Sequence, residues 1–151
     1  MSVYKSKRKE TFLIYLQQAR ELRLETLKAI KKFPTSYRYV ITNNMLDLAS
    51  KIYTNCLKAD SEVFRGSLNQ EKYLAKTNYL LEAISSTNAL LGEINFCLSL
   101  VYDGNNFFKD KDDISRTFLR WTEKGNSLLE TLKKILKYNR QEFIKRIKFI
   151  L

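Results

Sequence analysis

A long apolar repeat in the middle of the chain constrains its fold more than any other feature of the sequence. The repeat consists of residues that alternate at steps of four and three, namely Tyr73, Thr77, Leu80, Ile84, Thr87, Leu91, Ile94, Leu98 and Val101. This spacing places all of them on one side of an α-helix. At about 1.5 Å per residue, the helix would be about 40 Å long. It can bury that side only by packing lengthwise against other helices, so the repeat predicts a helical bundle.

The composition also favours a few long helices. Only four glycines and one proline occur in 151 residues, and residues of good helix propensity fill most of the remainder. We therefore predict one all-α domain over residues 1–151, an antiparallel up-down-up-down four-helix bundle with a basic N-terminal arm and an amphipathic C-terminal tail. The expected segments are helices at about 10–33, 36–65, 69–102 and 111–139, followed by the tail at 140–151.

Local signals set the ends of these helices. Pro34 ends the first helix, because the residue before a proline is disfavoured in the helical region. Gly66 separates the second helix from the third. Three aspartates, Asp110, Asp112 and Asp113, lie where the fourth helix begins. We expect them to cap the positive end of its dipole, and a loose cation site is the alternative.

Each of the other helices also has a predicted inner face. The face of the first comprises Phe12, Leu16, Ala19, Leu27 and Ile30, with Arg23 interrupting it. The face of the second comprises Ile41, Met45, Leu48, Ala49, Ile52, Cys56 and Leu57. The face of the fourth comprises Phe118, Trp121, Gly125, Leu128, Leu132 and Ile135. Because glycine is unfavourable in a helix interior, Gly125 indicates either a close helix crossing or a kink.

The sequence contains no recognisable catalytic apparatus. Histidine, the most frequent general base and metal ligand, is absent. No Gly-rich phosphate loop and no Glu-x-x-His pair occur. Cys56 and Cys97 fall within helical patterns and are expected to be small, buried apolar residues. We therefore predict a protein that is not an enzyme, with no catalytic residue, no metal site and no cofactor.

The same patterns argue against a membrane protein. No stretch approaches the roughly 20 apolar residues of a membrane span. The apolar run that follows the basic N-terminal residues is too short for a signal sequence. We predict that the chain has no membrane span and resides in the cytoplasm.

The charge of the chain indicates what it binds. The formal net charge is +11, and a positive field of this kind attracts polyanions, of which nucleic acid is the most common. Residues 1–40 contain ten Lys and Arg against three Asp and Glu, residues 41–115 contain seven against ten, and residues 116–151 contain ten against three. The basic charge therefore belongs to the first and fourth helices, which are neighbours in an up-down-up-down bundle.

The candidate nucleic-acid contacts are basic residues of these two helices and of the first turn. They are Lys5, Lys7, Arg8, Lys9, Arg23, Lys28, Lys31, Lys32, Arg38, Lys133, Lys134, Lys137 and Arg140. No zinc-finger spacing, aromatic sheet motif or glycine-bearing helix-turn-helix occurs. We therefore expect RNA or DNA to be bound through its phosphates, with strong salt dependence and weak sequence preference.

The tail at 140–151 continues the apolar period through Phe143, Ile147 and Ile150. Three alternatives are open for this face: it can fold back on the bundle, dock on a protein partner or a neighbouring subunit, or lie on a membrane surface. The three apolar residues are the candidate partner contacts. An assembly module whose basic face and apolar tail dock an acidic partner is therefore the alternative function.

The turn between the first two helices carries a family resemblance. It reads Lys32-Phe33-Pro34-Thr35-Ser36-Tyr37-Arg38-Tyr39-Val40-Ile41. Together with the stretch Lys-Thr-Asn-Tyr-Leu-Leu-Glu-Ala at 76–83, it resembles the four-helix-bundle family of proteins encoded in ribosomal-RNA intervening sequences and of the accessory variability determinant of diversity-generating retroelements. The resemblance covers about residues 10–138. The basic arm, the loop at 103–113 and the tail differ from the family pattern.

The resemblance implies a pentameric homo-oligomer with a basic surface that binds nucleic acid and a reverse transcriptase, and that assists mutagenic retrohoming without catalysing it. Arg38 is the first residue that it implies as a polyanion or partner contact. The leading hypothesis from the sequence is therefore a non-catalytic, nucleic-acid-binding accessory protein of a mobile element.

Overall fold

The computed structural model describes residues 2–61, 70–104, 108 and 110–150, with side chains described from residue 14 to residue 148 within those ranges. The described residues form four α-helices: α1 (Ser2–Ile30), α2 (Asn43–Ser61), α3 (Gln70–Tyr102) and α4 (Lys111–Ile150). Two short helical turns, η1 (Thr35–Tyr37) and η2 (Arg38–Thr42), join α1 to α2. No β-strand occurs within these ranges, so the predicted all-α class is confirmed.

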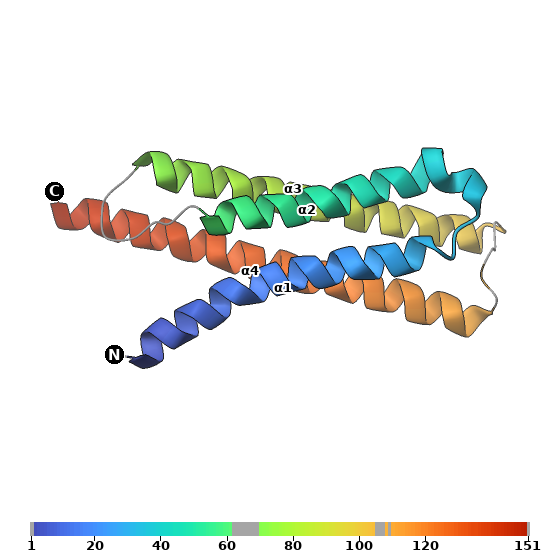
Figure 1. Ribbon diagram of the computed structural model, residues 1–151, viewed down its shortest axis with the longest axis horizontal. Helices are drawn as coiled ribbons and strands as arrows, with labels where there is room; N and C mark the ends of the chain where they lie inside the picture. The colour runs from blue at the N-terminus through green and yellow to red at the C-terminus, as the bar shows by residue number, and fades with distance from the viewer. Residues whose placement is uncertain (1, 62–69, 105–107, 109, 151) are drawn as a thin grey trace.

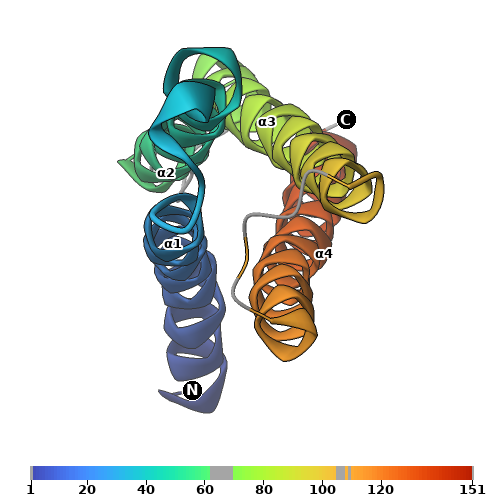
Figure 2. The ribbon, with the colours of Figure 1, turned by 90° about the vertical axis from the view of Figure 1, so that its right-hand side faces the viewer.

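The four helices lie side by side along a common axis, and each runs back toward the end from which its predecessor came (Figure 1). Each helix packs against the next one in the chain, and α4 also packs against α1 (Figure 2). One end of the molecule, which we call the turn end, therefore holds the end of α1 and the start of α4. Both chain termini lie at the opposite end, where the first turns of α1 diverge from the other helices in both views.

Several helix ends differ from the sequence expectation. The first helix begins at Ser2 and not at about residue 10, because the Lys- and Arg-rich arm has good helix propensity even without an apolar period. The expected tail is the continuous end of α4, which reaches Ile150. The second α-helix begins at Asn43, because residues 35–42 form η1, a 3-10 turn tighter than an α-helix, and η2, a π-turn wider than an α-helix. Residues 62–69, where we expected the second helix to end, lie outside the described residues.

The inner face of α1 differs most from the prediction. Its buried residues recur at steps of four and three, as Tyr15, Ala19, Leu22, Thr26 and Ala29, and Phe33 continues the pattern just after the helix. Leu27, predicted to lie inward, is 40% exposed. The polar residue Thr26 occupies the core because its hydroxyl is doubly satisfied: it donates to the Leu22 carbonyl at 2.8 Å and accepts from Trp121 Nε1 at 2.9 Å. Arg23 therefore lies outside the core stripe and does not interrupt it.

The inner faces of the other helices are closer to the prediction. In α4 all six predicted residues are buried, and in α3 the predicted seam is buried or half-buried along its whole length. In α2 the exception is Leu57, which is exposed. Gly125 marks a close helix crossing, because a Cβ built there would lie 2.6 Å from Cδ2 of Leu91 on α3. The contact is with the end of the Leu91 side chain, and it favours the close crossing over the kink.

Aromatic side chains fill the core at the turn end. The Phe33 ring packs edge-on against Phe108 and Trp121, with ring centroids 6.2 Å and 6.4 Å away. Phe118 packs against the same two residues, at 5.5 Å from Phe108 and 6.0 Å from Trp121. These contacts join the chain at the end of α1 to the start of α4. Edge-to-face pairs of this kind stabilise the fold beyond the burial of their apolar area. Through Phe33, the first turn is packed against the bundle core.

Candidate nucleic-acid interface

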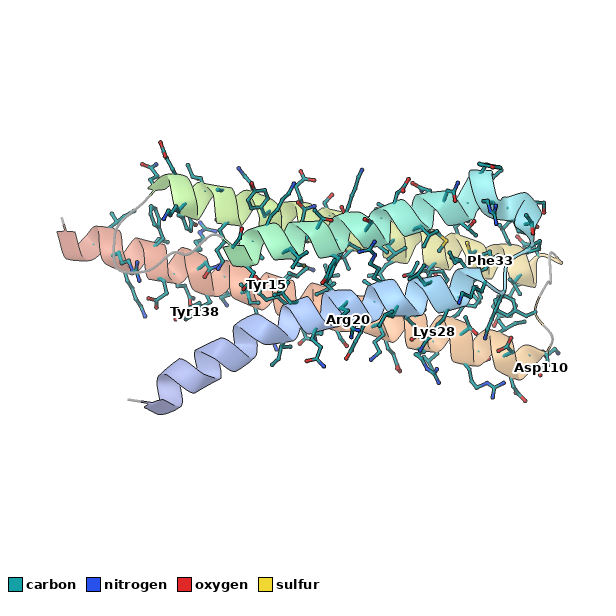
Figure 3. The ribbon with its side chains drawn as sticks, in the orientation of Figure 1. Tyr15, Arg20, Lys28, Phe33, Asp110 and Tyr138 are labelled. Carbon is teal, nitrogen blue, oxygen red and sulfur yellow. The ribbon has the colours of Figure 1, made fainter. Side chains whose placement is uncertain are left out.

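The turn end brings basic side chains of α1, η2 and α4 together. Figure 3 shows Lys28, Phe33 and Asp110 at this end of the molecule. The Asp110 carboxylate accepts a 2.6 Å hydrogen bond from the backbone N–H of Asp113, so the predicted capping of α4 is confirmed for this residue. The described residues contain no group of three or more His, Cys, Asp and Glu that could hold a metal ion. Asp110 thus caps the helix end, and Asp113 pairs with Lys32.

A groove runs between α1 and α4 at this end. It has a volume of about 290 Å³, and its lining comprises Glu25, Lys28, Ala29, Lys32, Asp113, Arg116, Thr117 and Arg120. We call it the α1–α4 groove. Four of these residues are cations and two are carboxylates, so the groove is positively charged.

Two of the four cations are held by the carboxylates. Lys32 Nζ lies 2.7 Å from Asp113 Oδ1 and donates to Thr117 Oγ1, also at 2.7 Å. Arg120 Nε lies 3.8 Å from Glu25 Oε1. The first pair joins the turn after α1 to α4, and the second joins α1 to α4. Their exposure limits each of them to at most about 1 kcal/mol of stability.

The remaining two cations, Lys28 and Arg116, are exposed and make no ion pair with any described residue. They come from facing helices and line the same groove. The ammonium group of Lys28 and the guanidinium group of Arg116 are therefore available to an anion. The other two cations of the groove are paired with carboxylates. A phosphate oxygen is the acceptor that such a pair suits best.

A second pocket lies where the first turn meets α2, and we call it the turn pocket. It is open, with a volume of about 530 Å³, and its lining comprises Ile30, Lys31, Phe33, Pro34, Thr35, Arg38, Thr42, Asn43 and Leu46. Among the described residues that line it, only Lys31 and Arg38 are charged, and neither makes an ion pair with a described residue. The four predicted contacts around the first turn are thus divided between two separate pockets.

The predicted contacts on the C-terminal half of α4 line neither pocket. Lys133, Lys137 and Arg140 are exposed, and their steps of four and three place them on one outer stripe of the helix. Lys134 pairs with Glu130 at 3.3 Å along the same helix. This stripe is a basic surface suited to loose contact with a charged backbone.

Other predicted contacts lie elsewhere. The Arg23 guanidinium lies 5.6 Å from the centre of the Tyr53 ring on α2, a cation–π contact on the side of α1 that faces α2. The side chains of Lys5, Lys7, Arg8 and Lys9 lie outside the described residues. Because the first turns of α1 diverge from α4, the backbone alone does not place them beside the end of α4 (Figure 2). Their role as nucleic-acid contacts stays a prediction.

The apolar face of the tail is used in part within the chain. The Phe143 ring stacks on Tyr73 of α3, with centroids 4.0 Å apart and planes within 2° of parallel. Ile147 is half-buried, and the side chain of Ile150 lies outside the described residues. Of the three alternatives for this face, the Phe143 contact favours packing on the bundle.

Sequence reasoning missed the contribution of Arg116 and Arg120 to the groove. Both were counted in the charge of the last third of the chain, but neither was proposed as a contact. The signal was available: in an antiparallel bundle the start of the fourth helix faces the end of the first, where Lys28 and Lys32 lie. Arg116 and Arg120 are four residues apart there, on one side of the helix.

The two thiols belong to the core and not to a site. Cys56 and Cys97 are free and buried. Burial raises the pKa of Cys56 to about 12, and burial with the nearby charge of Glu93 raises the pKa of Cys97 to about 12. A thiol with so high a pKa is a poor nucleophile at neutral pH. The prediction of small buried apolar residues is confirmed for both.

Comparison with other proteins leaves the site to be interpreted from its own chemistry. Across the described residues, no helix contains a stretch that is both long enough and apolar enough to cross a membrane. No family model matches the chain, and no match was found among curated proteins or solved structures.

Proposed function

We propose that this chain is an antiparallel up-down-up-down bundle that binds RNA or DNA through phosphate contacts and has no catalytic role of its own. The observation that carries the proposal is the α1–α4 groove, where Lys28 and Arg116 face one cavity without an ion-pair partner among the described residues. The charge of the chain supports it, because a net +11 attracts any polyanion before contact. The Lys133, Lys137 and Arg140 stripe would extend the contact along α4.

The salt dependence of binding tests this proposal. Each phosphate contact contributes about 0.9 to the slope of log K against log salt for duplex DNA. We expect the wild-type chain to bind duplex and single-stranded oligonucleotides at low salt, and Lys28→Gln with Arg116→Gln to lower the duplex slope by about 1.8. Lys51→Gln is the matched control for each substitution, since Lys51 is exposed on α2 and lines neither pocket.

Two results would overturn the proposal. One is the absence of binding by the wild-type chain at low ionic strength. The other is binding whose affinity does not change with salt concentration, because contacts to phosphates release counterions.

The family resemblance supplies a setting for this activity. We propose that the chain assists a reverse transcriptase in a diversity-generating retroelement, as a homo-oligomer that the resemblance implies to be pentameric, in the cytoplasm. The position of Arg38 supports this setting, since the residue singled out by the resemblance lies exposed in the turn pocket. Co-purification of the chain with the enzyme from a host that expresses both would test it.

A second candidate function, contact between copies of the chain, is favoured by the outer surface of α3. All exposed residues between Ala83 and Asp103 are uncharged: Ser85, Asn88, Ala89, Gly92, Asn95, Phe96, Ser99 and Tyr102. Phe96 is 52% exposed, Tyr102 is 72% exposed, and nothing lies within 4 Å of a Cβ built at Gly92. Copies that each carry a net +11 repel one another least across such a surface.

Light scattering tests this second function. We expect Phe96→Glu to shift the chain toward the monomer, because it would bury a charge in an interface. Leu119→Glu is the control, since Leu119 is 61% exposed on α4 and does not belong to the α3 surface. A wild-type chain that remains monomeric at millimolar concentration would exclude self-association.

A further inference from the structure

The turn pocket differs from the α1–α4 groove in having an apolar wall. The wall is formed by one buried residue, Phe33, and three half-buried ones, Ile30, Pro34 and Leu46. The Phe33 ring is fixed by its edge-on contacts with Phe108 and Trp121. The wall is therefore preformed, and a flat apolar group could cover it with little rearrangement.

The rim of the same pocket is cationic. Lys31, from the turn after α1, and Arg38, the first residue of η2, are both exposed and unpaired with any described acidic group. The described residues that line the pocket include no carboxylate, in contrast to the groove with its Glu25 and Asp113. A bound anion would therefore face no carboxylate among the lining residues.

The pocket also contains polar groups suited to the edge of a base. The side chains of Thr35 and Asn43 line it and are exposed. The Asn43 backbone N–H donates to the Arg38 carbonyl, the five-residue spacing of a π-turn, which holds Asn43 close to Arg38. An amide side chain both donates and accepts, as recognition of a base edge requires.

We infer that the turn pocket binds a single nucleotide, with the phosphate on Lys31 and Arg38, the base against the apolar wall, and Asn43 at the base edge. Its volume of about 530 Å³ lies within the range of about 300–1,000 Å³ that is usual for small-ligand pockets. This inference rests on the proposed function, and it adds a site for an unpaired or terminal nucleotide to the phosphate contacts of the groove. Single-stranded or frayed nucleic acid would be preferred for that reason.

Calorimetric titration of the full chain tests the inference. The ligands are the four ribonucleoside 5′-monophosphates, with inorganic phosphate as the reference at the same ionic strength. We expect at least one mononucleotide to bind about tenfold more tightly than phosphate, because the base adds contact with the apolar wall. Amide NMR signals of Thr35 and Asn43 should shift on its addition.

Paired variants locate the binding. Arg38→Gln should lower the mononucleotide affinity at least about tenfold, because a phosphate bound by a guanidinium loses its strongest partner. Lys51→Gln removes the same charge away from both pockets and should bind the mononucleotide as the wild-type chain does. Arg38 is exposed, and circular dichroism of the variant should match that of the wild type.

Each contrary result has a distinct meaning. Equal affinity for phosphate and mononucleotides, or mononucleotide binding unchanged in Arg38→Gln, overturns the nucleotide site. No mononucleotide binding with retained binding to duplex DNA also overturns it, and leaves the proposed function in place. Loss of all binding, including that of long RNA and DNA at low salt, overturns both. Binding to anionic lipid vesicles that is lost in Arg38→Gln and that mononucleotides fail to displace assigns the pocket to another ligand and overturns the inference.

Discussion

The two buried thiols make a prediction at the scale of single residues. Their pKa values of about 12 exceed the ordinary value of 9.0, so the folded chain keeps both protons at a pH where the unfolded chain loses them. The stability that this difference provides is complete below pH 9 and is lost as the pH rises toward 12. We expect the free energy of unfolding to fall above pH 9 by up to about 1.4 kcal/mol per pH unit for each thiol.

Urea unfolding at pH 8, 9 and 10 measures this loss. The control is the chain with Cys56→Ala and Cys97→Ala, which should be less stable throughout but should depend less steeply on pH. Identical pH slopes for the two proteins would contradict the assignment of the loss to the thiols.

At this scale, apolar residues were easier to place from the sequence than polar ones. The six-residue seam of α4 was predicted in full, because each of its members is apolar or small. Thr26 was missed, since its burial depends on a hydrogen bond from Trp121, 95 residues later in the chain. The sequence pattern placed Leu27 inward and not Thr26. Which of two adjacent residues is buried depends on the position of the helices packed against α1.

At the scale of the helices, two glycines predict opposite effects of the same substitution. Gly92 is exposed in α3 and its Cβ position is open, so Gly92→Ala should stabilise the chain by about 1 kcal/mol through helix propensity. Gly125 is buried in α4 against Leu91, and Gly125→Ala should destabilise the chain by about 1 kcal/mol, because overpacking outweighs the same gain.

Chemical denaturation of the two variants and the wild type checks the signs. A double-mutant cycle of Gly125→Ala with Leu91→Ala should show a favourable coupling, since the shorter side chain removes the contact. An equal stabilisation by both glycine substitutions would show that the crossing of α3 and α4 is looser than the structure has it.

Helix ends were the part of the elements that sequence patterns placed least well. The arm at residues 2–9 has no apolar period, so its helical backbone could only be argued from propensity. The π-turn at Arg38–Thr42 was not expected, because no residue type marks it in the sequence. The arm and the π-turn both contain predicted nucleic-acid contacts. The local backbone geometry therefore decides the direction in which those side chains leave the helix.

At the scale of the whole molecule, the spacing of basic groups predicts a length requirement for the ligand. Arg116 and Lys137 are 21 residues apart on α4, which is about 31 Å at about 1.5 Å per residue. A strand of duplex DNA covers that distance in about nine nucleotides at about 3.4 Å each. We expect affinity to rise steeply between 6 and 12 base pairs, in the order of tenfold, and to change little thereafter.

Fluorescence anisotropy with duplexes of graded length measures this step. Lys133→Gln with Lys137→Gln and Arg140→Gln should flatten the rise, because only the groove would then be engaged. A rise of equal size in that variant would show that the α4 stripe does not take part in binding.

The placement of the basic residues on two neighbouring helices could be predicted from the sequence. The individual pockets could not. Net charges of the chain segments, together with the expected order of the helices, place the cations on α1 and α4. The division of Lys28, Lys31, Lys32 and Arg38 between two pockets depends on side-chain pairs such as Lys32 with Asp113, which lie 81 residues apart.

The uneven distribution of charge gives the molecule an electric dipole moment as well as a net charge. Residues 41–115, which include α2 and α3, carry more acidic than basic groups, while the segments that contain α1 and α4 are strongly basic. The field of a polyanion would orient this molecule before contact, so that α1 and α4 face the polyanion. Each bound copy would then present the uncharged surface of α3 away from the nucleic acid, in an orientation shared by all copies along the strand.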